Sequence, residues 1–162
     1  KDSVTLALVT SLKREVGIDD PDININVEKG VVMISIADNL LFKSGSYDVN
    51  LKAKSVLAKV AKVVNSKPDF ECMVEGHTDD VPMHGSGEIK DNWDLSVMRA
   101  TSVTKIMLSA AKIDAERIIP AGRGEFFPLD KGKTPEARKK NRRTELILTP
   151  KLDELLKVLG SN

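Results

Sequence analysis

Residues 75–100 (EGHTDDVPMHGSGEIKDNWDLSVMRA) concentrate the side chains that could bind or react. The preceding stretch 70–75 alternates apolar and polar residues and is rich in β-formers, so it predicts a half-buried strand, which Gly76 ends. Asp79 therefore follows a strand end directly, and Arg99 falls in the first turns of the next helix. One carboxylate and one guanidinium at a strand-to-helix junction suit the binding of a small zwitterion better than a reaction.

The helix after this junction is indicated by apolar residues at helical spacing from Leu95 onward. Either Asn92 or Asp94 is expected to cap its N-terminus. Trp93, the only tryptophan, is expected to serve in packing, either in the core or as a lid over a pocket.

A metal-dependent hydrolase is one alternative, because His77, Asp79, Asp80 and His84 offer ligands for a metal ion. These residues lie in a glycine-flanked loop without the helical i, i+4 spacing of zinc motifs, and the chain has no third histidine. Ser96 lacks a nucleophile-elbow motif. We therefore expect no enzyme activity, no metal and no cofactor.

A nucleic-acid-binding protein is a second alternative, suggested by five cations in six residues, Arg138, Lys139, Lys140, Arg142 and Arg143. However, this tract carries no aromatic residue, and the formal net charge of the chain is only +1. We expect the tract to be a solvated helix end followed by the start of a strand.

Four motifs occur in a fixed order: GHTDDVP, NWDLSVMRA, GRGEFFP and TPEARKKNRRTEL. In this combination, residues 40–149 resemble the OmpA C-terminal-like family, whose periplasmic domains bind peptidoglycan noncovalently. The long segment between Asp79 and Leu95 and the Asn92-Trp93 pair are more similar to the MotB branch than to the porin branch. GRGE follows a strand but opens no helix, so we interpret it as a tight turn and not as a nucleotide-binding loop.

The resemblance implies a ligand, the diaminopimelate residue of the peptidoglycan stem peptide, whose side chain ends in an ammonium and a carboxylate. By that resemblance Asp79 takes the ammonium and Arg99 the carboxylate, with supporting contacts from Thr78, Asn92 and Arg142. A lysine in the same stem position lacks the terminal carboxylate and would leave Arg99 without its partner, so the site should reject it.

The resemblance further implies a noncatalytic role, in which the domain tethers an envelope-anchored protein to the cell wall. The expected location is the periplasm, with attachment to the outer membrane, or to the inner membrane if the parent protein is stator-like. The alternative is a structural or dimerisation domain without ligand binding. One departure from the family is Lys43, which stands where many members carry an acidic residue, and it puts a contact from that loop in doubt.

The alternation of strand and helix patterns predicts an α/β (α+β) two-layer sandwich, a mixed sheet with helices on one face and a βαβαβ(α)β core. The expected strands are a hairpin over 22–37 turning at Lys29-Gly30, then 70–75, 117–122 and 144–149. The expected helices are 51–64, the one after residue 94, and 134–141, which Pro135 opens. A chain of this length fits one domain.

Three segments follow from these patterns: an N-terminal amphipathic helix with its connector (1–21), the binding domain (22–149) and a C-terminal amphipathic helix (150–162). The C-terminal helix is predicted from the spacing i, i+3, i+4 and i+7 of Leu152, Leu155, Leu156 and Leu159. It would pack on the domain or on a second copy. The sequence resembles an excised fragment, with a membrane or lipid anchor expected upstream. Cys72, the only cysteine, cannot form an internal disulfide.

Overall fold

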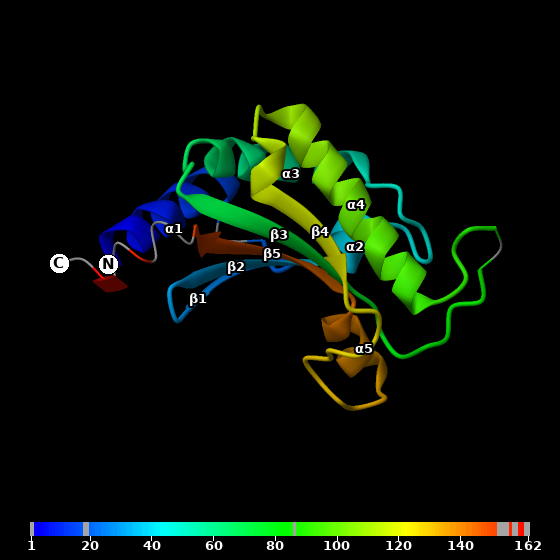
Figure 1. Cartoon of the computed structure of the whole chain (residues 1–162). Coiled ribbons are helices and arrows are strands. Elements are labelled where there is room, and N and C mark those ends of the chain that lie inside the picture. Colours follow the sequence, from blue (N-terminus) through cyan, green and yellow to red (C-terminus); the bar gives the residue numbers. More distant parts are fainter. Residues whose placement is uncertain (1, 18–19, 86, 152–155, 157–158, 161–162) are drawn as a thin grey trace.

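The chain folds into a five-stranded sheet with three long helices stacked over one face (Figure 1). The computed structural model describes residues 2–17, 20–85, 87–151, 156 and 159–160. Its helices are α1 (Asp2–Val16), α2 (Asp38–Leu41), α3 (Leu51–Asn65), α4 (Asn92–Ala110), the 3-10 helix η1 (Ala115–Arg117) and α5 (Pro135–Asn141). Its strands are β1 (Ile23–Glu28), β2 (Val31–Ala37), β3 (Phe70–His77), β4 (Ile118–Gly122) and β5 (Arg143–Pro150).

The strands lie in the order β1-β2-β5-β3-β4. Neighbours pair antiparallel except β3 and β4, which are parallel, so the sheet is mixed. Because β2 and β3 both run antiparallel to β5, the C-terminal ends of β2, β3 and β4 meet the start of β5 at one edge. Segments far apart in the sequence are thereby brought together at that edge.

The two faces of the sheet differ in burial, as the period of a strand requires. On β2 every second residue is buried, and these side chains join those of β3, β5, α1, α3 and α4 in one hydrophobic core. Leu8 and Leu12 place α1 in that core, since neither has any exposed surface. Among the residues that the structure describes, no long helix lies over the other face (Figure 1).

Two glycines allow α4 to approach the ends of β3 and β4. A Cβ at Gly76 would lie 2.2 Å from the backbone oxygen of Ser96, and one at Gly122 would lie 2.5 Å from the Ser96 hydroxyl. Real Cβ atoms do not come so close to other atoms, so only glycine fits at these positions. The first turns of α4, which carry Asn92 and Arg99, are thus held directly against the strand ends.

The predicted fold class is confirmed, and the observed strands match the five expected ones to within a few residues. Two short elements, α2 and η1, were not predicted. The capping prediction for α4 was wrong, because Asp91 is the cap and its carboxylate accepts the backbone N–H of Asp94 at 2.9 Å. Asn92 is instead the first residue of the helix. The predicted GRGE turn is present, with Gly124 at φ +58°.

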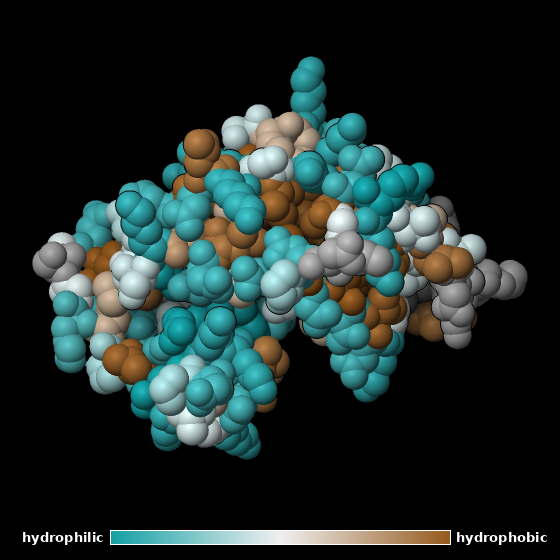
Figure 2. Space-filling view, turned by 180° about the vertical axis from the view of Figure 1, so that it is seen from behind, coloured by the Kyte–Doolittle hydropathy of each residue, from teal (hydrophilic) through white to brown (hydrophobic). Residues whose placement is uncertain are grey.

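Trp93 is half exposed, not in the core, and stacks on Phe126 with 5.1 Å between the ring centroids. The predicted tail helix lies largely outside the described residues. Hydrophobic residues on the rear face of the molecule form patches framed by hydrophilic ones (Figure 2). Among the residues that the structure describes, no helix combines the length and hydrophobicity needed to cross a membrane.

Candidate binding site

Two carboxylates and two guanidiniums gather at the sheet edge where β2, β3 and β5 meet. Asp38 follows β2, Asp79 follows the end of β3, Arg142 precedes β5, and Arg99 reaches the edge from α4. They form two ion pairs, Arg142 with Asp79 and Arg99 with Asp38. Three of the four were predicted from the sequence as ligand contacts, and Asp38 was not.

The Asp79–Arg142 pair is the more accessible of the two. Arg142 Nη1 donates to Asp79 Oδ2 at 2.7 Å, and the side chains are 38% and 13% exposed, respectively. The second carboxylate oxygen of Asp79 accepts the backbone N–H of Val81 at 3.0 Å. Asp79 is therefore a fixed acceptor that a solvent-borne cation can approach.

The Arg99 guanidinium is buried and firmly held. Its Nη1 donates to Asp38, its Nε to the Ser46 carbonyl at 2.8 Å and its Nη2 to the Lys43 carbonyl at 3.3 Å. The guanidinium also lies 4.8 Å from the centre of the Phe42 ring. Burial raises the pKa of the Asp38 carboxyl, against the opposing effect of Arg99, and burial likewise lowers the pKa of Arg99.

The loop around Lys43 therefore contributes to the site through its backbone. The contacts to Arg99 come from the carbonyl oxygens of Lys43 and Ser46, which any side chain at these positions would leave in place. The departure from the family at Lys43 thus does not remove this contact.

Thr78 and Asn92 fix the shape of the loop that carries Asp79. The Asn92 side-chain amide donates to the carbonyls of Asp79 at 3.4 Å and Val81 at 3.1 Å, and it lies 3.3 Å from Glu125 Oε1. The Thr78 hydroxyl donates to the Asp79 carbonyl at 2.8 Å, and its backbone N–H to the Gly124 carbonyl. Both residues are buried, so these contacts support the site from behind.

Asp80 points away from this site and binds the segment around α5. Its carboxylate accepts from Lys133 Nζ at 2.6 Å and Arg138 Nε at 2.8 Å, which lowers the pKa of Asp80, chiefly through the hydrogen bond from Arg138. These ion pairs connect the Asp79 loop to α5. Three arginines of the basic tract, Arg138, Arg142 and Arg143, are thus paired with carboxylates.

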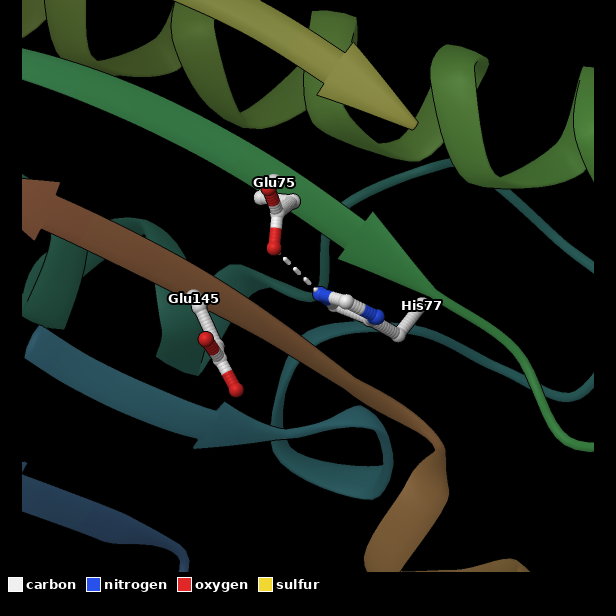
Figure 3. A group of neighbouring side chains, drawn as sticks. All are labelled: Glu75, His77 and Glu145. Carbon is white, nitrogen blue, oxygen red and sulfur yellow. Dashed lines mark hydrogen bonds and ion pairs between the residues drawn. The ribbon is translucent and has the colours of Figure 1, made fainter. Parts of the chain in front are cut away.

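The structure separates the four residues of the predicted metal alternative. His77 faces Glu75 and Glu145 on the sheet face opposite the three long helices (Figure 3). His84 is exposed on the loop. Ser96, considered as a nucleophile, is fully buried. Its hydroxyl donates to the Trp93 carbonyl and accepts from Gly124 N–H, both at 2.9 Å, so it serves the packing of α4.

Glu75, His77 and Glu145 offer ligand atoms within 4.8 Å of one another, the spacing of a possible cation site (Figure 3). However, His77 Nε2 already lies 2.8 Å from Glu75 Oε1, Arg123 pairs with Glu75 at 3.2 Å, and Arg143 pairs with Glu145 at 2.6 Å. Two arginines balance the two carboxylates, so a divalent cation would leave the cluster with excess positive charge. The arrangement therefore fits an internal ion network better than a metal centre.

Two hollows flank the site region. One of about 590 Å³ is lined by Gly87, Glu88, Ile89, Lys90, Trp93, Asp94, Val97 and Met98. The other, of about 240 Å³, is lined by Asp80, Glu125, Phe126, Pro128, Asp130, Lys131, Gly132, Lys133 and Asn141. Neither is lined by Asp79 or Arg99. The Asp79–Arg142 pair is partly exposed, whereas the Arg99–Asp38 pair is buried.

Comparison with known proteins shows the family of this domain. The model of the OmpA family matches residues 41–142. The chain belongs to the OmpA family. It is 32% identical over 120 residues to Motility protein B of Bacillus subtilis, which covers 74% of this chain and 46% of that protein. The chain thus spans about half the length of this relative.

Solved structures agree with a MotB-like domain. A putative MotB-like protein from Desulfovibrio vulgaris superposes with a TM-score of 0.81 at 27% identity, over 92% of this chain and 93% of that one. The cell wall anchor of the type VI secretion system (T6SS) from Pseudomonas aeruginosa has the same fold, with a TM-score of 0.74 at 24% identity, over 91% and 97% of the two chains.

Proposed function

We propose that this domain binds peptidoglycan noncovalently through the diaminopimelate residue of the stem peptide, and so tethers an envelope-anchored protein to the cell wall. It performs no catalysis in this role. The observation that carries the proposal is the gathering of Asp79, Arg99 and Arg142 at one sheet edge of an OmpA-family domain. A protein of the same fold is the cell wall anchor of the T6SS from Pseudomonas aeruginosa, and this supports the anchoring role.

In the proposed complex the ligand ammonium replaces Arg142 as the partner of Asp79. The Asp79–Arg142 pair is partly exposed, and exposed ion pairs are weak, on the order of 0–1 kcal/mol, so this exchange costs little. The released Arg142 and the fixed Arg99 then face the ligand carboxylate. Arg99 has five N–H donors and uses three in the contacts described, so its fork can still donate to a carboxylate.

The binding unit comprises residues 22–149, with the terminal segments 1–21 and 150–162 as extensions that connect it to the rest of the parent protein or to a second copy. Its location is the periplasm, and the anchor lies in the outer membrane, or in the inner membrane if the parent is stator-like. One stem peptide should bind with modest affinity because the site is open, and many stem peptides on one wall supply avidity.

Calorimetric titration of the domain with a diaminopimelate stem peptide, beside the matching lysine peptide, tests this function. We expect selective binding of the diaminopimelate peptide. Asp79→Asn should lower that affinity at least tenfold, because it removes the charge that holds the ammonium. Arg99→Lys should reduce the preference for the diaminopimelate peptide over the lysine peptide, because a lysine side chain at position 99 lacks the bidentate fork of arginine.

Asp69→Asn serves as the matched control, since Asp69 is exposed and precedes β3 at the end opposite to Asp79. It removes the same charge and should bind like the wild type. Arg99→Ala is less informative, because an unpaired buried Asp38 would destabilise the fold by about 3–5 kcal/mol. Equal binding of both peptides, or no loss in Asp79→Asn, would refute the proposed clamp.

A further inference from the structure

Asp38 gives the proposed site its balance of charge. The site holds two carboxylates, Asp38 and Asp79, and two guanidiniums, Arg99 and Arg142, so its formal charge is zero. Asp79 and Arg142 act electrostatically on both members of the buried pair. The four groups therefore behave as one electrostatic unit, in which a change at Asp38 is felt by a ligand at Asp79 and Arg99.

A neutral array of buried and half-buried charges selects its ligand by net charge. A diaminopimelate end carries one ammonium and one carboxylate, so its binding leaves the site neutral. A carboxylate alone leaves one uncompensated negative charge in a partly desolvated place, which is unfavourable. Without the charge of Asp38 the site would instead carry +1 and would accept a lone carboxylate readily.

We infer that Asp38 is a specificity-determining residue of this site: as the built-in counter-ion of Arg99, it favours ligands that carry an ammonium and a carboxylate together over ligands that carry the carboxylate alone. The inference rests on the proposed function and deepens it. Asp38 is 8% exposed and acts through Arg99 as a positioning residue, without touching the ligand.

Asp38→Asn isolates this electrostatic role. The backbone N–H of Asp38 donates to the Arg142 carbonyl at 3.1 Å, and the Phe42 N–H donates to the Asp38 carbonyl at 2.8 Å; neither bond depends on the side chain. Asparagine has the same shape and keeps an oxygen that can accept from Arg99. The variant therefore changes the charge and little else.

Three synthetic stem peptides provide the measurement. One carries diaminopimelate, the second 2-aminopimelate, which keeps the side-chain carboxylate but lacks the ammonium, and the third lysine, which keeps only the ammonium. In calorimetric titrations at pH 7 the wild type should prefer diaminopimelate over 2-aminopimelate. Asp38→Asn should reduce that preference on the order of tenfold, the effect of one charge at close range in a partly screened site. Asp38→Asn should also lower the affinity for the lysine peptide.

Two variants separate this role from a purely structural one. Asp38→Glu keeps the charge and should keep the preference. Asp48→Asn removes a charge from the same connecting segment at an exposed position that does not pair with Arg99, whose partners are Asp38, Lys43 and Ser46, and it should bind all three peptides like the wild type. A merely structural role of Asp38 would lower the affinity of Asp38→Asn for all three peptides by a similar factor, and that result would overturn the inference.

If Asp38→Asn does not fold, the wild type gives the answer through its pH dependence. Burial raises the pKa of Asp38, whose charged neighbours are Arg99 of α4, Arg142 at the end of α5 and Asp79 after β3. Protonation removes the same charge, so the preference for diaminopimelate should fall as the pH is lowered from 7 through the raised pKa of Asp38, and a preference that stays constant down to the pH at which the domain unfolds would contradict the inference. A wild type that binds no peptide would overturn the proposed function and this inference together, whereas an intact wild-type preference that Asp38→Asn retains would overturn the inference alone.

Discussion

Glu75 connects the buried polar side chains on the open face of the sheet. It accepts from His77 and Arg123, and its side chain is only 6% exposed. The hydrogen bond from His77, together with Arg123, lowers the pKa of Glu75 below its ordinary value of 4.5. A carboxyl whose pKa is lower in the folded state stabilises the fold above its unfolded pKa and loses that contribution as the pH falls.

We therefore expect Glu75→Gln to lower the free energy of unfolding by about 1–3 kcal/mol at pH 7, because a buried ionic hydrogen bond is lost. The difference from the wild type should shrink as the pH falls below about 4.5 toward the lowered pKa of the folded Glu75, because protonation removes the charge that stabilises the wild type. Urea unfolding of both proteins between pH 3 and pH 7 measures this. A difference that stays constant across the range would show that the charge of Glu75 does not contribute.

Cys72 is expected to be chemically inert in the folded protein. It lies in β3 with 1% of its surface exposed, and burial raises the pKa of its thiol to about 12. Since the thiolate is the reactive form, a thiol reagent at pH 8 should modify Cys72 only after denaturant is added. Rapid modification without denaturant would mean that β3 opens readily.

At the level of elements, the contact of α4 with the ends of β3 and β4 positions the site. Gly76→Ala should disturb it, because the new Cβ would lie 2.2 Å from the backbone oxygen of Ser96 and would push α4 away. We expect a loss of about 1–3 kcal/mol in unfolding free energy and a weaker affinity for the stem peptide, since α4 carries Arg99. Denaturant unfolding and calorimetry measure the two effects.

Gly132→Ala is the control for that substitution. Its nearest contact would be a side-chain oxygen of Asp130 at 3.1 Å, so Asp130 would need to shift by only a few tenths of an ångström, and Gly132 is not among the residues of the proposed site. It should change stability and affinity little. If Gly76→Ala behaves like Gly132→Ala, the close packing of α4 on β3 does not position the site.

Most elements could be predicted from the sequence, because periodicity and turn residues act locally. Asp79 and Arg99 were identifiable because each belongs to a recognisable motif. Asp38 was not, since its role depends on strand order: only the placement of β5 between β2 and β3 brings the residue after β2 next to the others. Its one local signal was a charged residue that ends the alternating strand 31–37. The Asp91 cap was missed because four polar residues compete for that role within residues 91–96.

At the scale of the whole molecule, the protein is a small MotB-like domain whose three long helices cover one face of the sheet and whose proposed binding site occupies one edge (Figure 1). The proposed ligand is repeated along the cell wall, so retention on the wall depends on the number of engaged domains as well as on the affinity of each. Weak binding of a single stem peptide is therefore compatible with firm anchoring.

The most direct test of the central claim is cosedimentation of the domain with intact sacculi. At equal wall mass, sacculi whose stem peptides carry diaminopimelate should retain the domain, free diaminopimelate stem peptide should release it, and lysine-type sacculi should retain much less. Equal retention on both kinds of sacculi, or none on either, would contradict recognition of the wall through diaminopimelate.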